Sequence, residues 1–291
     1  MKARPGLAVL MGLIVNPDAG GKLAVVLLLC SLAGCAGTGS ELSSKLAQQQ
    51  QLVRSEQKNN IASLTEAIKN NPKDANALNL RGAAYGQAGE YEKALEDFNA
   101  ALAINPQYAQ AYSNRALINV RAKRLPQAIS DYDQAINLDP NYAVAYVGRG
   151  SAHRSMNNHP MAIADFTRAL ELQGDPIAFF NRGLSRQAMG QHPQALDDFD
   201  NALGFRPDAP EVYHAKGLSE LELKKYEKAY DDFYKAAQGS TNNYEAWALR
   251  GRAAEGMGAK KEAAKAYQRA LQINPSFRPA REGLDRVGNE A

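Results

Sequence analysis

The sequence contains few of the residues from which disulfide, metal or catalytic sites are built. Only two of its 291 residues are cysteine, Cys30 and Cys35, and both lie near the N-terminus. The folded body therefore cannot hold a disulfide framework or a thiolate metal site. The four histidines are scattered, with no carboxylate or cysteine at ligand spacing, and are His153, His159, His192 and His214. We expect no metal in this protein.

A large excess of one charge is also missing. Lysine and arginine number 34 and aspartate and glutamate 31, which gives a net charge of +3. Nucleic-acid-binding surfaces need a concentrated basic charge, so we expect no nucleic-acid partner. No nucleophile–base pair and no glycine-rich phosphate loop occurs in the sequence. We therefore predict no catalytic residue, no cofactor and no enzymatic activity.

Long hydrophobic runs are absent as well. The apolar segment Leu23–Leu32 has ten residues, whereas a membrane-spanning helix needs about 20. Lys22 precedes this segment, and the small residues Ala33 and Gly34 follow it. A basic flank, a short apolar core and small residues are typical of a secretory signal.

The ending Leu32-Ala33-Gly34-Cys35 resembles the bacterial lipobox. The resemblance implies a lipoprotein signal peptide over residues 1–34, cleavage before Cys35, and lipidation of its thiol. Because Ala36 and not aspartate follows, it further implies the periplasmic face of the outer membrane. Several acyl chains would hold the protein firmly, and residues 35–44 would form a flexible tether. The alternatives are a signal peptide without lipid and an uncleaved anchor. The long segment before the apolar core also leaves open that translation starts at Met11.

The rest of the chain repeats with a period of 34 residues, once 33. A small residue is followed twelve residues later by alanine, four further on by an aromatic residue, and three after that by another alanine. The small residues are Gly82, Ala116, Gly150, Gly183, Gly217 and Gly251. The aromatic residues are Phe98, Tyr132, Phe166, Phe199, Phe233 and Tyr267. This pattern predicts helix pairs, in which the small residue permits close approach and the ring fills the space between units.

Four of the units end with a proline, which cannot continue a helix: Pro106, Pro140, Pro207 and Pro275. Together with a bulky residue at position four of each unit, the pattern resembles the tetratricopeptide repeat, in six units over residues 75–275. The resemblance implies an all-α fold, a solenoid of stacked antiparallel helix pairs (a TPR superhelix), that binds other proteins or peptides. Residues 41–74 are predicted to form a degenerate leading helical hairpin, and residues 276–291 a C-terminal capping helix and tail.

Two charged series recur within the units. Position seven carries Arg81, Arg115, Arg149, Arg182, Lys216 and Arg250. Position 23 carries Asp97, Asp131, Asp165, Asp198 and Asp232, whereas Ala266 interrupts the series. An arginine row could bind phosphate or carboxylate groups. Since an acid accompanies the base in five units, we favour a ladder of partly buried ion pairs.

In tetratricopeptide repeats, positions two, five, nine and twelve of the first helix line the concave face. The predicted partner-binding residues on and beside this face are Leu117, Val144, Val147, Ile177, Phe180, Asn181, Leu184, His214, Leu218 and Leu221. Soluble proteins seldom leave a contiguous apolar strip unused. The alternatives are that a homodimer covers the strip or that it packs internally.

The two resemblances imply a lipid-anchored periplasmic scaffold, similar to outer-membrane lipoproteins of this family that recruit cell-wall or quality-control enzymes of the envelope. The membrane contact would be made by Cys35. The alternatives are a pilus or secretin assembly factor, similar to the pilotin lipoproteins of this family, and a cytoplasmic interaction module.

Overall fold

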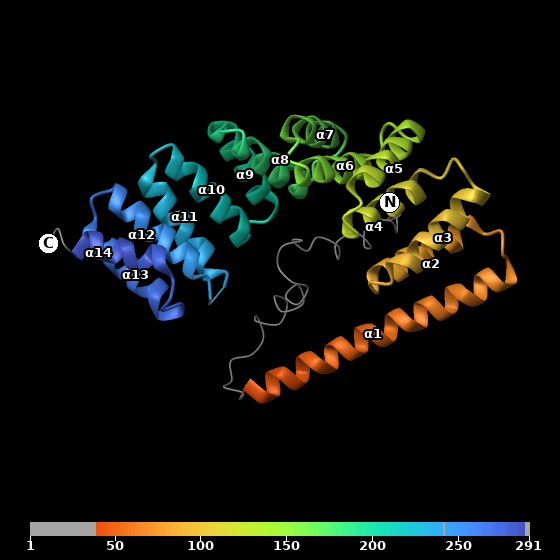
Figure 1. Cartoon of the computed structure of the whole chain (residues 1–291), viewed down its shortest axis with the longest axis horizontal. Helices are drawn as coiled ribbons and strands as arrows, with labels where there is room; N and C mark the ends of the chain where they lie inside the picture. Colours follow the sequence, from red (N-terminus) through yellow and green to blue (C-terminus); the bar gives the residue numbers. More distant parts are fainter. Residues whose placement is uncertain (1–38, 241, 289–291) are drawn as a thin grey trace, which may run out of the picture. The chain divides into compact units, whose positions relative to one another are not determined.

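The structure, a computed structural model, describes residues 39–240 and 242–288. These residues form fourteen helices and no strand, so the predicted all-α solenoid of paired helices is confirmed (Figure 1). None of the described helices is long and apolar enough to span a membrane. The chain divides into two compact units, one ending at Leu138 and one beginning at Asp139, which are described separately.

Unit 1 contains five helices. They are α1 (Gly39–Asn70), α2 (Ala75–Gln87), α3 (Tyr91–Ile104), α4 (Ala109–Arg121) and α5 (Leu125–Leu138). Helices α2 and α3 form one hairpin and α4 and α5 the next, while α1 packs against α2. Unit 1 therefore holds two complete repeat hairpins preceded by one long helix.

The leading segment differs from the prediction. Helix α1 runs without interruption over 32 residues, so the expected hairpin over residues 41–74 is wrong. Residues 39–44 of the expected tether belong to this helix, and residues 35–38 lie outside the described part of the chain. The segment from 41 to 70 contains neither glycine nor proline, and the first helix breaker is Pro72. No residue between 41 and 70 therefore breaks the helix as glycine or proline would.

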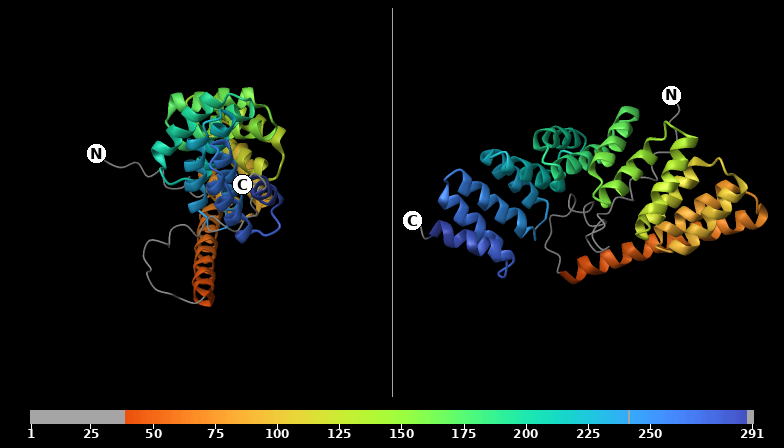
Figure 2. Two further views of the ribbon diagram at one scale, coloured as in Figure 1. Left: turned by 90° about the vertical axis from the view of Figure 1, so that its left-hand side faces the viewer. Right: turned by 45° about the horizontal axis from the view of Figure 1, so that its top comes forward.

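Unit 2 contains nine helices. They are α6 (Ala143–Ser155), α7 (His159–Leu172), α8 (Pro176–Ala188), α9 (His192–Phe205), α10 (Pro210–Glu222), α11 (Tyr226–Gln238), α12 (Tyr244–Gly256), α13 (Lys260–Ile273) and α14 (Arg278–Gly288). Each packs against the next in chain order (Figure 2). The even-numbered helices α6, α8 and α10 also contact one another in turn. The first helices of successive repeats thus form one continuous layer.

The core of each hairpin is built from the repeating small and aromatic residues. In α8 and α9, a Cβ atom placed on Gly183 would lie 2.6 Å from Cε1 of Phe199, which is too close for two carbon atoms. Phe199 is fully buried, as are the alanines on either side of it in the pattern, Ala195 and Ala202. Only a residue without a side chain lets the ring lie flat against the facing backbone here. The predicted close approach at the small position is therefore confirmed, and the ring lies in one core cluster with Val212 and Ala215 of the next unit, as predicted.

Helix α14 closes the C-terminal end of unit 2. It packs against α13 and α12, and it buries Ala280 and Val287. Gly283 faces the ring of Tyr267, where a Cβ atom would clash with the ring. The remaining residues of α14 are mostly charged and exposed, as expected of a helix that covers the last hairpin of a repeat array.

Candidate functional site

The basic residue at position seven of the first helix bonds to the acid on the second helix of the same hairpin. Four arginines donate from both Nε and Nη2 to one carboxylate, at donor–acceptor distances of 2.5–3.2 Å. The pairs are Arg81–Asp97, Arg115–Asp131, Arg149–Asp165 and Arg182–Asp198. The four carboxylates are buried, so the interpretation as a structural ladder is confirmed. These arginines do not form a row that faces a ligand.

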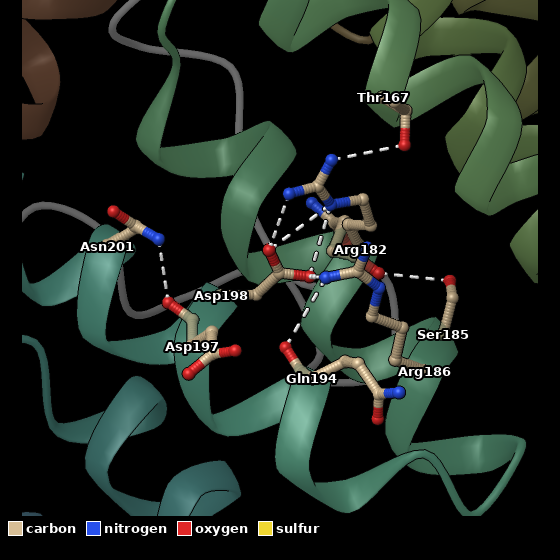
Figure 3. Close-up of polar contacts among 9 residues, drawn as sticks. Thr167, Arg182, Ser185, Arg186, Gln194, Asp197, Asp198 and Asn201 are labelled. Carbon is tan, nitrogen blue, oxygen red and sulfur yellow. Dashed lines mark hydrogen bonds and ion pairs between the residues drawn. The ribbon is translucent and has the colours of Figure 1, made fainter.

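The hairpin of α8 and α9 holds two such bases (Figure 3). Arg182 and Arg186 both bond to Asp198, and Arg182 also donates to the hydroxyl of Thr167 on the preceding helix. Asp198 is 1% exposed. A buried carboxylate is tolerated when several charged donors satisfy it, as they do here.

The last hairpin departs from the ladder because Ala266 replaces the acid. Arg250 instead lies over three aromatic rings, with its Cζ 4.0 Å from the centroid of Tyr230 and 4.4 Å from that of Tyr234. The third ring is Trp247. Cation–π contacts of this kind can hold a guanidinium in place without a carboxylate.

The candidate groove is defined by six half-buried apolar residues on the first helices of unit 2: Val144, Val147, Ile177, Phe180, Leu184 and Leu218. Val147, Phe180 and His214 occupy the same position in successive repeats. Because α6, α8 and α10 contact one another in that order, the structure brings these side chains into one row. Leu117, which is also half-buried, lies on α4 in unit 1 and is not part of this row.

The groove residues rest on the hairpin cores. The ring of Phe180 lies 6.1 Å from that of Phe199, and His214 meets Phe233 edge-on at 5.9 Å between ring centroids. Leu184 packs on the same cluster as Phe180, and Val147 packs on that of Phe166. The side chains are therefore held in place from beneath and keep part of their surface exposed.

Two predicted binding residues are not available at this surface. Asn181 is 8% exposed and donates from its side chain to the carbonyl of Ile177, one turn earlier in α8. Leu221 is 7% exposed and packs into the core of the α10–α11 hairpin. Both residues face neighbouring helices, so neither can contribute more than a small contact area to a partner.

An open pocket of about 360 Å³ lies beside His214, between α10, α12, α13 and α14. Ala248 and Arg252 of α12 line it, as do Phe277 and Arg286 near the C-terminus. Arg286 bonds to Glu255, which also accepts a hydrogen bond from the hydroxyl of Tyr267. The concave-face positions of the last repeat could have pointed to Ala248 and Arg252. The pocket residues on α14 could not be predicted from the repeat positions, because α14 lies outside the repeat pattern.

The electrostatics of His214 suit an apolar surface. Burial lowers the pKa of His214 below its usual value, and the nearby carboxylate of Glu245 opposes this shift. A histidine with a lowered pKa is uncharged at neutral pH. His214 therefore adds no positive charge to the C-terminal end of the groove.

The described residues contain no group of three or more side chains able to hold a metal ion.

Comparison with known families decides what kind of protein carries these hairpins. Five models of the tetratricopeptide repeat match, at residues 75–108, 120–157, 143–176, 180–245 and 244–277. The chain is built of tetratricopeptide repeats.

Solved structures with the same fold include several other tetratricopeptide-repeat proteins. YrrB, "a TPR protein with an unusual peptide-binding site", has a TM-score of 0.61 and 21% identity over 66% of this chain and 99% of its own. PilW, a "widely conserved type IV pilus biogenesis factor", has a TM-score of 0.61 and 21% identity over 73% of this chain and 97% of its own.

A chain of the hetero-tetramer Cut9-Hcn1 of the APC/C has a TM-score of 0.62 and 20% identity over 80% of this chain. The present chain spans 46% of that chain, less than half of its length. No curated protein matches. At these identities the structures establish a shared fold. Together with the repeat matches they support a protein that binds other proteins or peptides.

Proposed function

We propose that this tetratricopeptide-repeat protein is a scaffold that binds an apolar segment of a partner protein in the groove of unit 2. The observation that carries the proposal is the row of half-buried aliphatic and aromatic side chains on α6, α8 and α10. These side chains are fixed by the cores beneath them, so a partner that covers them gains hydrophobic free energy without first having to order the groove. A peptide-binding site in YrrB, which has the same fold, supports this function.

The groove is tested by replacing Phe180 and Leu184 together with glutamate. Two charges in an apolar strip should weaken partner binding about 30-fold or more, as expected when a binding hot spot is lost. Partners are first identified by crosslinking in intact cells and mass spectrometry, and binding to the purified protein is then titrated. The matched control is Met161→Glu, which places a glutamate on the exposed start of α7, outside the groove.

The double variant must retain its circular dichroism spectrum and melting transition, because Phe180 contacts the core ring of Phe199. If it unfolds, Val144→Glu replaces it, since Val144 is a half-buried residue of the same row on α6. Unchanged binding of every partner by the folded groove variants would disprove the proposed site. Sedimentation of the purified protein distinguishes a homodimer that covers the groove from a different partner.

We further propose that the scaffold is a lipoprotein at the periplasmic face of the outer membrane and recruits cell-wall or quality-control enzymes there. This rests on the likeness of residues 32–35 to a lipobox, which lies outside the described residues. We expect palmitate to label the protein in cells, and the Cys35→Ser variant to lose the label and leave the membrane fraction. Failure of the wild-type protein to incorporate palmitate would contradict the anchor but leave the groove untouched.

A second candidate function is assembly of a pilus or secretin. The similarity of fold to PilW, described as a type IV pilus biogenesis factor, favours it. The two functions predict different cargo, because an adaptor should crosslink to soluble envelope hydrolases and an assembly factor to a multimeric secretin. A cytoplasmic interaction module is the third possibility, and it is the one that remains if Cys35 carries no lipid and the protein stays inside the cell.

A further inference from the structure

In three hairpins, the residue at position eleven of the first helix brings a second nitrogen toward the ladder acid. Asn119 donates to Asp131 at 3.1 Å, and Arg186 donates to Asp198 at 2.9 Å (Figure 3). In the hairpin of α6 and α7, Nε2 of His153 lies 3.9 Å from Asp165. The residue type differs in every case, yet each one brings a nitrogen toward the buried carboxylate.

The hairpin of α10 and α11 has a carboxyl group at this position. Glu220 is 1% exposed and Asp232 5% exposed, and Glu220 stands at the position from which Asn119 and Arg186 reach the acids of their own hairpins. Oε2 of Glu220 and Oδ2 of Asp232 are both buried without a hydrogen-bond partner among the described residues. The ladder base is Lys216, whose Nζ lies 3.5 Å from Asp232 but 2.7 Å from Asp200 of α9. The single ammonium group of Lys216 is therefore shared between the carboxylates of Asp200 and Asp232.

Two buried carboxylates that face each other cannot both remain ionised at low energetic cost. A single proton on Glu220 removes one negative charge and supplies a donor for a hydrogen bond between the two carboxyl groups. Burial, and then the negative charge of Asp232, raise the pKa of Glu220 to about 7. The geometry and the electrostatics therefore lead to the same arrangement, a carboxyl–carboxylate pair.

We propose that Glu220 and Asp232 share one proton, and that this shared proton stabilises the packing of α10 against α11. Release of the proton then destabilises the hairpin as the pH rises through neutrality. The charged groups around the pair do not remove the effect. Lys228 and Lys235 of α11 offset part of the negative charge, whereas Asp200 of α9 adds to it. His192 of α9 reaches Ser219, the residue before Glu220, and the neighbouring Gln187 of α8 is neutral.

The direction of the pH effect follows from the binding of the proton. An unfolded chain releases the Glu220 proton near pH 4.5, whereas the folded chain keeps it until about pH 7. Between these values the folded state binds more protons, so the folding equilibrium constant falls as the pH rises. This is opposite in sign to the usual effect of a salt-bridged carboxylate, whose contribution to stability grows as the pH rises to about 5 and is then constant.

The test compares the wild-type protein with Glu220→Gln in urea unfolding from pH 5 to pH 8.5. The glutamine amide can donate to Asp232 at every pH, as the amide of Asn119 does to Asp131. Relative to this variant, the wild-type folding equilibrium constant should fall at least tenfold across the range. The shift from 4.5 to about 7 sets a ceiling of about 300-fold. Hydrogen exchange should place the loss in α10 and α11.

Glu222→Gln is the matched control, because Glu222 lies on the same helix and is exposed. It should show the wild-type pH profile. His192 is present in all three proteins, so it does not account for a difference between them. A constant ratio between the wild type and Glu220→Gln across the range would overturn the proposal. If that variant does not fold, the carbon-13 shift of the Glu220 carboxyl is titrated in the wild type, and a midpoint below pH 5 would overturn it equally.

Discussion

Replacing Asp198 with alanine is expected to lower the free energy of unfolding of unit 2 by about 3–5 kcal/mol. Asp198 accepts hydrogen bonds from Arg182 and Arg186 and lies buried between α8 and α9. Alanine would remove the carboxylate but leave both guanidinium groups, which are 14% and 21% exposed, without their counter-charge. The loss in stability arises from these two largely buried charges without a partner charge, and not from the intrinsic strength of the ion pair. Urea unfolding followed by circular dichroism at 222 nm measures it.

The neighbouring Asp197 provides the control. It is on the same helix, it is exposed, and its side chain makes no bond in Figure 3, where only its backbone carbonyl accepts from Asn201. We expect Asp197→Ala to change the free energy of unfolding by no more than about 0.5 kcal/mol. Equal effects of the two substitutions would mean that the ladder contributes nothing beyond surface charge.

The ladder and the hairpin cores could be predicted from the sequence because a repeated helix pair places the same positions together in every unit. Arg182 and Asp198 are sixteen residues apart in the sequence, and in a single hairpin this separation does not indicate that the two side chains are in contact. Its recurrence in five hairpins shows that the two positions face each other. The same reasoning identified Gly183 and Phe199 as opposing core positions, and the structure confirms both pairs.

Features outside the repeat could not be predicted in this way. Pro72 stands one period before Pro106 and so predicts a leading hairpin, but residues 41–70 contain neither glycine nor proline and form one continuous helix. The pocket beside His214 depends on how α14 docks, which no repeat position specifies. The pairing of Glu220 with Asp232 was missed for a different reason. Position eleven changes residue type in every unit, so only the structure reveals that its side chains share a partner.

The second large effect is expected from Phe199→Ala, which should lower the free energy of unfolding by about 3–5 kcal/mol. The ring is 0% exposed and fills the space over Gly183 between α8 and α9. Alanine would leave a cavity there, and because the facing residue has no side chain, nothing nearby can expand to fill it. Thermal and urea unfolding of the full chain measure the loss, and unfolding of α8 and α9 should precede that of their neighbours.

Phe199→Tyr is the matched control, since tyrosine occupies this position in two other hairpins as Tyr132 and Tyr267. The hydroxyl of Tyr267 donates to Glu255, and Gln187 stands at the corresponding position opposite Phe199. The added hydroxyl therefore has an acceptor within the fold, and we expect a change below about 1.5 kcal/mol. A large loss for tyrosine would show that this hairpin is packed too tightly to admit one further atom.

The alanine variant also tests the link between the core and the groove. Phe180 rests on Phe199, so its side chain loses support when that ring is removed. Measured under conditions in which Phe199→Ala is still folded, partner binding should weaken although Phe199 itself is buried and cannot touch the partner. A groove residue that is held from beneath binds without losing side-chain freedom, whereas an unsupported one must first be ordered. Undiminished binding would show that the partner contacts a surface whose shape does not depend on Phe180.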